Sequence, residues 1–353
     1  MRDASEPHAA DLSQLLPSRG AVAVFWIAAG GGRVMLQRVD DKTRQHEAFR
    51  ADVIAGLSQR QKTLPSRWLY DDRGCELFEA ITHLDEYYPT RTETAILAEN
   101  AREIADFCGA QAVVLEYGAG AARKTEILLE ALAAPRLYVP IDIAADFVME
   151  TSTRVRDRFP GLKVQPIAAD FTSDFNIPVT VPARQRVAFF PGSTIGNLNE
   201  AETNGFLRRM RHHVGALGRA IIGADLKKDV ATLIAAYDDG AGVTARFNLN
   251  LLARINRELA GSFRLDQFVH EARWNDAESA IEMHLVSLKR QSATVAGQSF
   301  QFRAGETIHT ESSRKYTLDG FAKLATNNGW QASKIWADAE RRFALFGLSC
   351  GGA

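Results

Sequence analysis

Short apolar runs alternate with amphipathic segments through the middle of the chain. Runs typical of buried strands lie at residues 112–117, 136–141, 164–167, 186–190 and 219–223. Between them, apolar residues recur at helical spacing over residues 123–133, 146–158 and 199–216. Because parallel strands need a crossover connection, usually a helix, this alternation predicts an α/β fold in which helices cover both faces of a parallel sheet.

The pattern changes beyond the fifth strand. Helical spacing continues over residues 230–237 and 244–260, and alternating runs near residues 264–303 predict antiparallel strands. A helical segment at residues 318–329 and a strand-like run at 342–349 return to the character of the sheet. This order predicts an α/β nucleotide-binding domain that is interrupted by an α+β insert.

The segments before the first strand are less regular. Residues 44–62 carry apolar positions at helical spacing, and Thr90 followed by Glu93 resembles a capping box that opens a helix to about Phe107. The leader, residues 1–40, has no helical period and is broken by three consecutive glycines. We expect it to be poorly ordered, and Met35 offers an alternative start.

Charge and cysteine content narrow the class of protein. The 353 residues carry a formal net charge of −1. The sequence therefore has no excess of basic residues of the kind that indicates binding to nucleic acid or to a membrane surface. The longest uncharged run, residues 20–32, is too short to span a bilayer, and acidic residues precede it, unlike in a signal peptide. Cys75, Cys108 and Cys350 fit neither a disulfide framework nor a metal site, which favours a reducing cytoplasm and no metal.

A glycine turn follows the first strand of the sheet. The run Val113–Tyr117 leads into Gly118-Ala119-Gly120, and a helical pattern comes next. Glycines let a ligand approach the backbone N–H groups at the start of that helix. Because a third glycine is missing and Glu116 precedes the turn, the full dinucleotide fingerprint fits poorly. A nucleoside ligand without a pyrophosphate, such as S-adenosylmethionine, suits the turn better.

Polar residues end the next two strands. Asp142, 24 residues after Gly118, can accept hydrogen bonds from both ribose hydroxyls, although a surface Asp that caps the following helix is the plain alternative. Asp170 with Phe171 can bind an adenine amino group and pack on the base, although this is also a common pair between strand and turn.

Three further motifs have both a functional and an ordinary interpretation. The turn Gly192–Leu198 ends the fourth strand, where Asn197 can hold the amino and carboxylate groups of a substrate or simply cap a helix. The polar stretch Glu311–Tyr316 is alone typical of a solvated loop, and Tyr237–Gly240 of a helix-ending turn. His284 and His309 are isolated histidines, for which a structural or surface role is expected.

Taken together, these motifs resemble the histidine-specific, S-adenosylmethionine-dependent α-N-methyltransferases of ergothioneine biosynthesis (the EgtD-like family), which trimethylate histidine to hercynine. The resemblance runs from about residue 40 to the C-terminus. The motifs that carry it are Trp68–Asp71, Glu86–Arg91, Tyr117–Gly120 with Lys124-Thr125, Gly192–Leu198, Gly223–Asp229, Ala236–Asp239, Phe247-Asn248 with Asn250, Ile281–Met283 and Ile308–Tyr316.

The resemblance implies a Rossmann-like class I methyltransferase sheet with helices on both faces, plus an α+β substrate-binding domain. The implied S-adenosylmethionine-binding domain comprises residues 93–225 with 314–353, and the implied substrate domain comprises residues 41–92 with 226–313. The implied cofactor residues are Tyr70, Gly118, Lys124, Asp142, Asp170 and Phe171. The implied substrate residues are Tyr87, Asn197, Tyr237, Met283, Glu311 and Ser313.

The resemblance also assigns roles within the site. Tyr70, Asn197 and Tyr237 are the implied catalytic residues, and Asn197 with Tyr237 is expected to hold the amino and carboxylate groups of histidine. Glu311 and Ser313, with Tyr87, are expected to bind the imidazole ring, in a pocket that Met283 closes.

Three other functions stay open at this point. One is an α-N-methyltransferase for another aromatic amino acid, tryptophan or tyrosine; a second is a nicotinamide-dependent oxidoreductase; a third is a non-catalytic cofactor sensor. The missing third glycine and the Asp170-Phe171 pair disfavour the oxidoreductase. We expect L-histidine as the small-molecule partner, no nucleic acid or membrane partner, and a monomer.

Overall fold

A computed structural model of the protein describes residues 25–29, 32–36, 41–120 and 123–350. The chain divides into two units, residues 1–49 and 50–353. In the first unit, strands β1 (Phe25–Ala29) and β2 (Gly32–Leu36) pair antiparallel, and helix α1 (Asp41–Leu57) begins. The rest of the leader, for which we expect poor order, lies outside the described residues.

The second unit contains an eight-stranded sheet. Its strand order is β15-β16-β9-β8-β4-β5-β6, with β7 paired to β5. The strands from β9 to β7 are parallel, whereas β16 runs antiparallel to both of its neighbours. This order confirms the predicted Rossmann-like class I methyltransferase sheet. The strand bounds are β4 Val113–Tyr117, β5 Leu137–Asp142, β6 Lys163–Val164, β7 Ile167–Ala168, β8 Arg186–Phe190, β9 Arg219–Asp225, β15 Trp330–Ala337 and β16 Phe343–Cys350.

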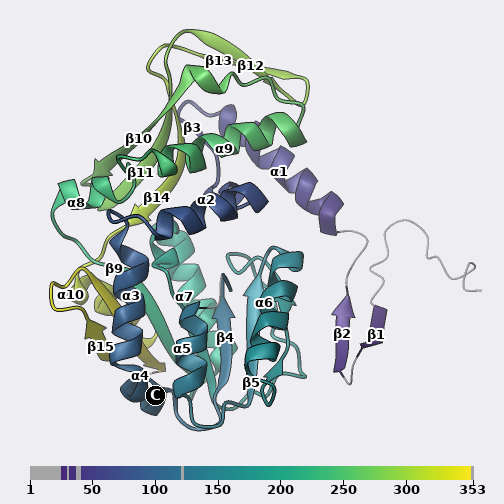
Figure 1. The fold of residues 1–353 in the computed structure, drawn as a ribbon, viewed down its shortest axis with the longest axis vertical. Helices are drawn as coiled ribbons and strands as arrows, with labels where there is room; N and C mark the ends of the chain where they lie inside the picture. Colours follow the sequence, from purple (N-terminus) through teal and green to yellow (C-terminus); the bar gives the residue numbers. More distant parts are fainter. Residues whose placement is uncertain (1–24, 30–31, 37–40, 121–122, 351–353) are drawn as a thin grey trace, which may run out of the picture. The chain divides into compact units, whose positions relative to one another are not determined.

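Helices cover both faces of this sheet (Figure 1). Side chains alternate along β4, so that Val113 and Leu115 join the buried cluster with α7 and α10, while Val114 joins the cluster with α3, α4, α5 and α6. Every β4 residue is buried, as expected for a central parallel strand. The helix bounds are α3 Tyr88–Glu99, α4 Ala101–Cys108, α5 Arg123–Ala131, α6 Ala145–Arg158, α7 Glu200–Val214 and α10 Leu318–Asn327.

A second sheet holds four strands in the order β10-β11-β14-β3. Strands β10, β11 and β14 are mutually antiparallel, and β3 is parallel to β14. The strand bounds are β10 Phe268–Asn275, β11 Ala280–Ser287, β14 Thr307–Arg314 and β3 Lys62–Thr63, and a separate hairpin pairs β12 Gln291–Val295 with β13 Gln298–Phe302. The remaining elements are α2 Asp72–Thr82, α8 Val230–Ala235, α9 Val243–Glu258, and the 3₁₀ segments η2 Ser66–Leu69, η3 Thr194–Asn197 and η4 Leu265–Gln267.

The capping box predicted at Thr90 is wrong. Helix α3 already begins at Tyr88, and the helix ends at Glu99, so the segment to Cys108 is two helices rather than one. The Glu93 side chain does not return to its own helix: it accepts hydrogen bonds from the Gly192 backbone N at 2.8 and 2.9 Å and pairs with Lys124. A fully buried carboxylate needs such partners, and the helix start cannot supply them.

Candidate active site

The glycine turn after β4 is tight and brings two strand ends together. Gly118 has a φ of +67°, and the Gly120 N–H donates to the Gly118 carbonyl at 2.8 Å. A Cβ atom on Gly118 would lie 3.5 Å from the ring of Phe171. Because the turn and this ring face one another at the carboxyl edge of the parallel strands, they form the kind of cradle that the sequence predicts for a nucleoside.

The two predicted cofactor carboxylates are both anchored by backbone. Oδ1 of Asp142 accepts from the Ala144 N–H at 2.9 Å, and burial raises the pKa of Asp142 to about 6. Helix α6 has Ala144 as its N-cap, so Asp142 is not the helix cap of the alternative interpretation. Oδ1 of Asp170 accepts from the Thr172 N–H at 2.8 Å, while its Oδ2 lies 3.7 Å from Arg67. Oδ2 of Asp170 also accepts from the Ser173 hydroxyl at 3.3 Å, and each carboxylate retains acceptor positions that a ligand can use.

Lys124, one of the predicted cofactor residues, is anchored by a buried carboxylate. Its ammonium pairs with the buried Glu93, which in turn holds the Gly192 N–H. Its neighbour Thr125 donates to the buried Glu116 at 2.7 Å. The Lys124-Thr125 motif therefore connects the start of α5 to two buried carboxylates and fixes the loop that ends β8.

The loop after β8 is held by unusual backbone conformations. Gly192 and Ser193 have φ values of +83° and +56°, and the Ser193 hydroxyl accepts from the Asp225 N–H at 2.9 Å. A Cβ on Gly196 would lie 2.7 Å from the Arg314 carbonyl oxygen, so only glycine lets this loop pack on the end of β14. The loop thus presents Asn197 beside β14.

Asn197 is not a helix cap. The N-cap of α7 is Asn199, which forms a capping box with Glu202. The Asn197 side chain is half-buried, and in the described part of the chain no hydrogen bond is recorded for its amide. An amide with free donor and acceptor positions at the end of a parallel strand is suited to bind the polar groups of a ligand.

The polar stretch after residue 306 is a buried strand, not the solvated loop of the plain interpretation. Glu311 pairs with Met283 of β11 and Ser313 pairs with Ile281, so all four share one face of the sheet. The register shifts beside Met283, and His309 pairs with His284 on the opposite face. The exposed fractions of Glu311 and Ser313 are 7% and 2%.

Lys315 continues this face and is the centre of a buried network. Its Nζ donates to the Tyr237 hydroxyl and to Ser313 Oγ, both at 2.9 Å, and lies 2.7 Å from Asp225 Oδ2. The Tyr237 hydroxyl donates to Ser313 Oγ at 2.7 Å. The network joins β14 to the turn after α8 and to the carboxyl end of β9.

Asp225 is a fully buried carboxylate with ample partners. Besides Lys315, it accepts from Lys228 Nζ at 2.6 Å and from the Tyr88 hydroxyl at 2.8 Å. Burial alone would raise the pKa of Asp225, but the two ammonium groups outweigh burial and hold the pKa below its ordinary value. Asp225 is therefore ionised and saturated, which makes it a structural anchor of the site.

Glu311 has the opposite surroundings. Its Oε2 is buried and has no hydrogen-bond partner in the described part of the chain. Burial raises the pKa of Glu311 to about 7, against the opposing effect of Lys315. A buried acceptor without a donor is costly, so this oxygen is positioned to receive a donor from a ligand.

Aromatic rings line the same region. Tyr70 contacts Phe78 and Phe247 edge to face, each at a centroid distance of 5.5 Å, while Tyr87 contacts Phe78 at 6.1 Å and Tyr237 at 6.2 Å. Burial raises the pKa of Tyr70 well above its ordinary value, yet 36% of its surface is accessible. Because 36% of its surface is accessible, the Tyr70 ring can contact a ligand, and aromatic faces favour a cationic one.

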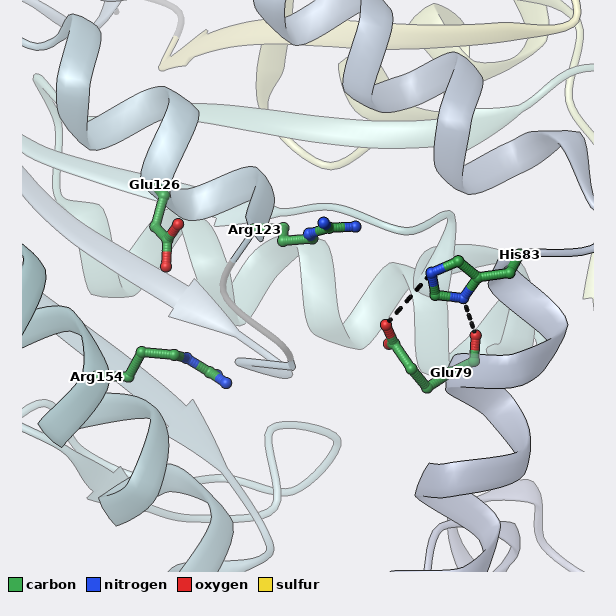
Figure 2. A pocket seen from close by; sticks show the side chains of 5 residues that line it. All are labelled: Glu79, His83, Arg123, Glu126 and Arg154. Carbon is green, nitrogen blue, oxygen red and sulfur yellow. Dashed lines mark hydrogen bonds and ion pairs between the residues drawn. The ribbon is translucent and has the colours of Figure 1, made fainter.

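A cavity of about 390 Å³ lies between α2, α5 and α6. Figure 2 shows the five side chains that line it, with the His83 ring hydrogen-bonded to the Glu79 carbonyl at 2.8 Å. The lining residues are Glu79, His83, Arg123, Glu126 and Arg154. None of them is a predicted site residue, and their mixed charges define no ligand.

Among the residues that the structure describes, no group of three or more His, Cys, Asp or Glu side chains is arranged to hold a metal ion. No helix in the described ranges is both long and apolar enough to cross a membrane.

Comparison with known proteins decides the family. The family model described as "Histidine-specific methyltransferase, SAM-dependent" matches residues 49–350. The chain belongs to this family. It is 40% identical over 306 residues to a histidine N-alpha-methyltransferase of Mycobacterium tuberculosis, which covers 85% of this chain and 94% of that protein.

Two relatives with lower sequence identity have different names. An ergothioneine biosynthesis protein 1 of Neurospora crassa is 29% identical over 288 residues, which are 78% of this chain and 32% of that protein. A 4-dimethylallyltryptophan N-methyltransferase of Claviceps purpurea is 25% identical over 324 residues, which are 84% of this chain and 93% of that protein. One relative is thus named for a substrate derived from tryptophan rather than histidine.

The structure brings together much of the predicted substrate set of this methyltransferase. The residues linked by strand pairing, ring contact or hydrogen bond are Tyr87, Tyr237, Met283, Glu311 and Ser313. Sequence reasoning missed Lys315, Asp225 and Phe78 as site residues. Lys315 and Asp225 lie within the sequence motifs that carry the family resemblance, and this position is a signal that could have identified them. Phe78 carries no such signal, because its helical spacing is the same as that of any core residue.

Proposed function

We propose that this chain transfers three methyl groups from S-adenosylmethionine to the α-amino nitrogen of L-histidine, giving hercynine in ergothioneine biosynthesis. The observation that carries this proposal is the unpaired, buried Glu311 carboxylate next to Ser313 and opposite Met283. An imidazole N–H is the donor that this acceptor lacks. An indole or phenol ring in the same position would leave more of the polar groups of the pocket without a hydrogen bond.

The carboxyl edge of the large sheet fits S-adenosylmethionine. The Gly118 turn facing Phe171 leaves room for close approach to the backbone, and Asp142 keeps one oxygen for a ribose hydroxyl. Tyr70 and Asp170 complete the proposed set, with Lys124 acting through Glu93 on the Gly192 loop. When bound, the cofactor supplies an electrophilic methyl group on its sulfonium.

The protein's own contribution is alignment and proton removal. The amine must be neutral and in line with the methyl group, about 3–3.5 Å from it, and we assign its positioning to Asn197 and the tyrosines around it. Burial raises the pKa values of Tyr70 and Tyr87, so both are neutral phenols and neither is a resting base. The accessible Tyr70 can instead pass the amine proton to water.

We also assign roles to the aromatic rings and to Tyr237 as the substrate becomes methylated. As methyl groups accumulate, the product becomes a quaternary ammonium, which the faces of Tyr70, Tyr87 and Phe247 stabilise by about 0.5–2 kcal/mol. The role proposed for Tyr237 toward the substrate carboxylate requires its hydroxyl to leave Ser313, on which it donates here. That role remains a proposal.

Other features of the proposal concern the molecule as a whole. We infer a substrate domain of residues 41–92 with 226–313 and a cofactor domain of residues 93–225 with 314–353. We also infer a monomer in a reducing cytoplasm. The domain proposal agrees with the pairing of β3 and β14 in one sheet, since these strands come from the two ends of the proposed substrate segments.

A single experiment separates the proposed function from its alternatives. Purified protein is incubated with S-adenosylmethionine and an equimolar mixture of histidine, tryptophan and tyrosine, and products are read by mass spectrometry. Trimethylated histidine as the main product supports the proposal. Methylated tryptophan or tyrosine as the main product would replace it with the other aromatic amino acid, and no methylation together with tight NAD binding would favour an oxidoreductase.

A further inference from the structure

The Tyr237 hydroxyl donates its only proton to another residue of the site. It donates to Ser313 Oγ at 2.7 Å, and Lys315 Nζ donates to both of these oxygens at 2.9 Å. The ammonium of Lys315 also lies 2.7 Å from Asp225 Oδ2, so all three of its donors are used. Lys315 therefore fixes the positions of the two oxygens, while the protons on them can still turn.

Both acceptor positions of Ser313 Oγ are filled in this structure. One receives Lys315 and the other receives the Tyr237 O–H. A donor from a ligand can therefore reach Ser313 only after one of these two leaves. Lys315 is fully buried and paired with Asp225, whereas the phenol proton of Tyr237 needs only a rotation about its C–O bond. Tyr237 is therefore the donor that can leave.

The ring proposed for this pocket brings two N–H groups. An ionised Glu311 favours the cationic form of imidazole, in which both ring nitrogens carry a proton. The unpaired Oε2 of Glu311 can accept from one of them. The second N–H needs a second acceptor, and Ser313 lies two residues later on the same face of β14. Ser313 can be that acceptor only if the Tyr237 proton turns away.

We propose that the carboxylate of the substrate draws the Tyr237 proton away from Ser313 and thereby opens Ser313 to the imidazole ring. The Tyr237 hydroxyl has one proton, so it cannot donate to a carboxylate and to Ser313 together. Binding of the carboxylate and binding of the ring therefore assist each other, and the site favours complete α-amino acids over ring-bearing amines that lack a carboxylate. This inference rests on the proposed function, since it assumes the proposed places of the carboxylate and the ring.

The test uses three ligands that share a trimethylammonium group. Hercynine has both the carboxylate and the imidazole ring, trimethylated histamine has the ring alone, and trimethylated alanine has the carboxylate alone. Because the amine is quaternary in all three, its protonation does not affect the comparison. Dissociation constants are measured at one pH with S-adenosylhomocysteine present, by calorimetry, either directly or by displacement of hercynine.

Tyr237→Phe leaves an acceptor position of Ser313 open at all times. Trimethylated histamine should therefore bind about threefold more tightly to this variant than to the wild-type protein, since it no longer has to displace a donor. Hercynine should bind about tenfold less tightly to the same variant, because the hydrogen bond to its carboxylate is lost. These opposite changes are the signature of the exchange, because a merely structural role of Tyr237 would weaken both ligands together.

Ser313→Ala gives the reciprocal result. The Tyr237 proton then has no Ser313 oxygen to leave, so trimethylated alanine should bind about threefold more tightly than to the wild-type protein. Ser312→Ala is the matched control, because Ser312 lies on the other face of β14 and is bonded to His309. It should change none of the three dissociation constants by more than about twofold.

The other results overturn the exchange. Parallel weakening of hercynine and trimethylated histamine by Tyr237→Phe would leave Tyr237 with a structural role. Weaker hercynine with unchanged trimethylated histamine would show that Tyr237 does not block Ser313. If Tyr237→Phe does not fold, Ser313→Ala decides alone, and trimethylated alanine that binds it no more tightly than the wild-type protein overturns the proposal. Failure of hercynine to bind the wild-type protein would instead contradict the proposed function.

Discussion

Asp225 and Glu311 are both buried carboxylates, but their surroundings give them different uses. Asp225 is saturated by two ammonium groups and a phenol, so it has nothing left to offer a ligand. Glu311 keeps Oε2 unpaired, and its pKa of about 7 places its titration in the physiological range. At the residue scale, we therefore propose that the unsatisfied acceptor of Glu311 decides substrate identity.

Replacing Glu311 should change which ring is preferred. Glu311→Ala is expected to lose about 2–4 kcal/mol in kcat/KM for histidine, because a charged hydrogen-bond partner of the ring is removed. The same change removes the unpaired carboxylate that excludes apolar rings, so the ratio of tryptophan to histidine methylation should rise. A competition assay with both amino acids measures the ratio by product mass. An unchanged preference for histidine would show that Glu311 does not contact the ring.

The stability of the free protein should also report on Glu311. Its pKa is raised from 4.5 to about 7 in the folded state, so the folded state binds the proton more tightly and loses stability relative to the unfolded state as pH rises between these values. The variant Glu311→Gln has no titrating carboxyl at this position and therefore lacks this pH-dependent contribution to the free energy of unfolding. The free energy of unfolding of the variant relative to wild type should therefore rise by about 3 kcal/mol from pH 4.5 to above pH 7. Urea denaturation at both pH values measures it, and a pH-independent difference would contradict it.

Asp142 should contribute to cofactor affinity rather than to the fold. Asp142→Ala is expected to weaken S-adenosylmethionine binding at least about tenfold, since a charged hydrogen bond to ribose contributes about 1.5–3 kcal/mol. Asp142→Asn is the matched control, because it can still accept from the Ala144 N–H and should lose less. Calorimetry measures affinity, and circular dichroism checks the fold. Unchanged affinity in both variants would show that Asp142 only stabilises the turn in which it accepts from the Ala144 N–H.

At the scale of elements, the site depends on loops that buried charges hold in place. The Gly192 loop is tied to α3 through Glu93, and Glu93 is tied to α5 through Lys124. The same loop packs through Gly196 on the end of β14. The cofactor side and the substrate side are thus connected by one segment of backbone.

A double-mutant cycle tests this connection. Lys124→Met leaves Glu93 buried without its cation and should cost about 3–5 kcal/mol of stability. Adding Glu93→Gln removes the unpaired charge but keeps an acceptor for the Gly192 N–H, so the double variant should be more stable than Lys124→Met alone. Denaturant unfolding of the four proteins gives the coupling. Strictly additive losses would show that the two residues act independently.

The sequence predicted the elements that have one apolar face and missed those that do not. The alternation of buried runs with amphipathic ones predicts the parallel strands and their helices, but it does not predict the order of the strands in the sheet. The pattern of the stretch that contains β14 is alone typical of a loop, because Glu311 and Ser313 in the strand, and Lys315 just after it, occupy the face that core residues normally occupy. Periodicity cannot reveal a strand whose buried face is a polar network, since burial of those side chains depends on distant partners such as Asp225.

At the scale of the whole molecule, the two units differ in their relation to the family. The family model matches residues 49–350, which is nearly all of the second unit, while residues 1–49 form the first unit. The proposed site consists entirely of residues from the second unit. The leader is therefore expected to be dispensable for methyl transfer.

Deletion of residues 1–34 tests this expectation. The shortened protein should keep kcat/KM for histidine near that of the full chain, and its Tm should change by less than about 3 °C, which corresponds to about 2 kcal/mol for a protein of this size. Activity assays and calorimetric melting measure both. A large fall in either would show that the leader contributes to the second unit.

The contact of Gly196 with the Arg314 carbonyl has a consequence for substrate length. Asn197, proposed to hold the amine, follows Gly196 directly, and Glu311 and Ser313, proposed to hold the ring, precede Arg314 on the same strand. The main-chain positions from which these side chains extend are therefore held at a fixed separation by a contact of main chain with main chain. If these two proposals are right, we expect that an amino acid with one methylene more than histidine can place its ring in the pocket or align its amine with the methyl group, but not both.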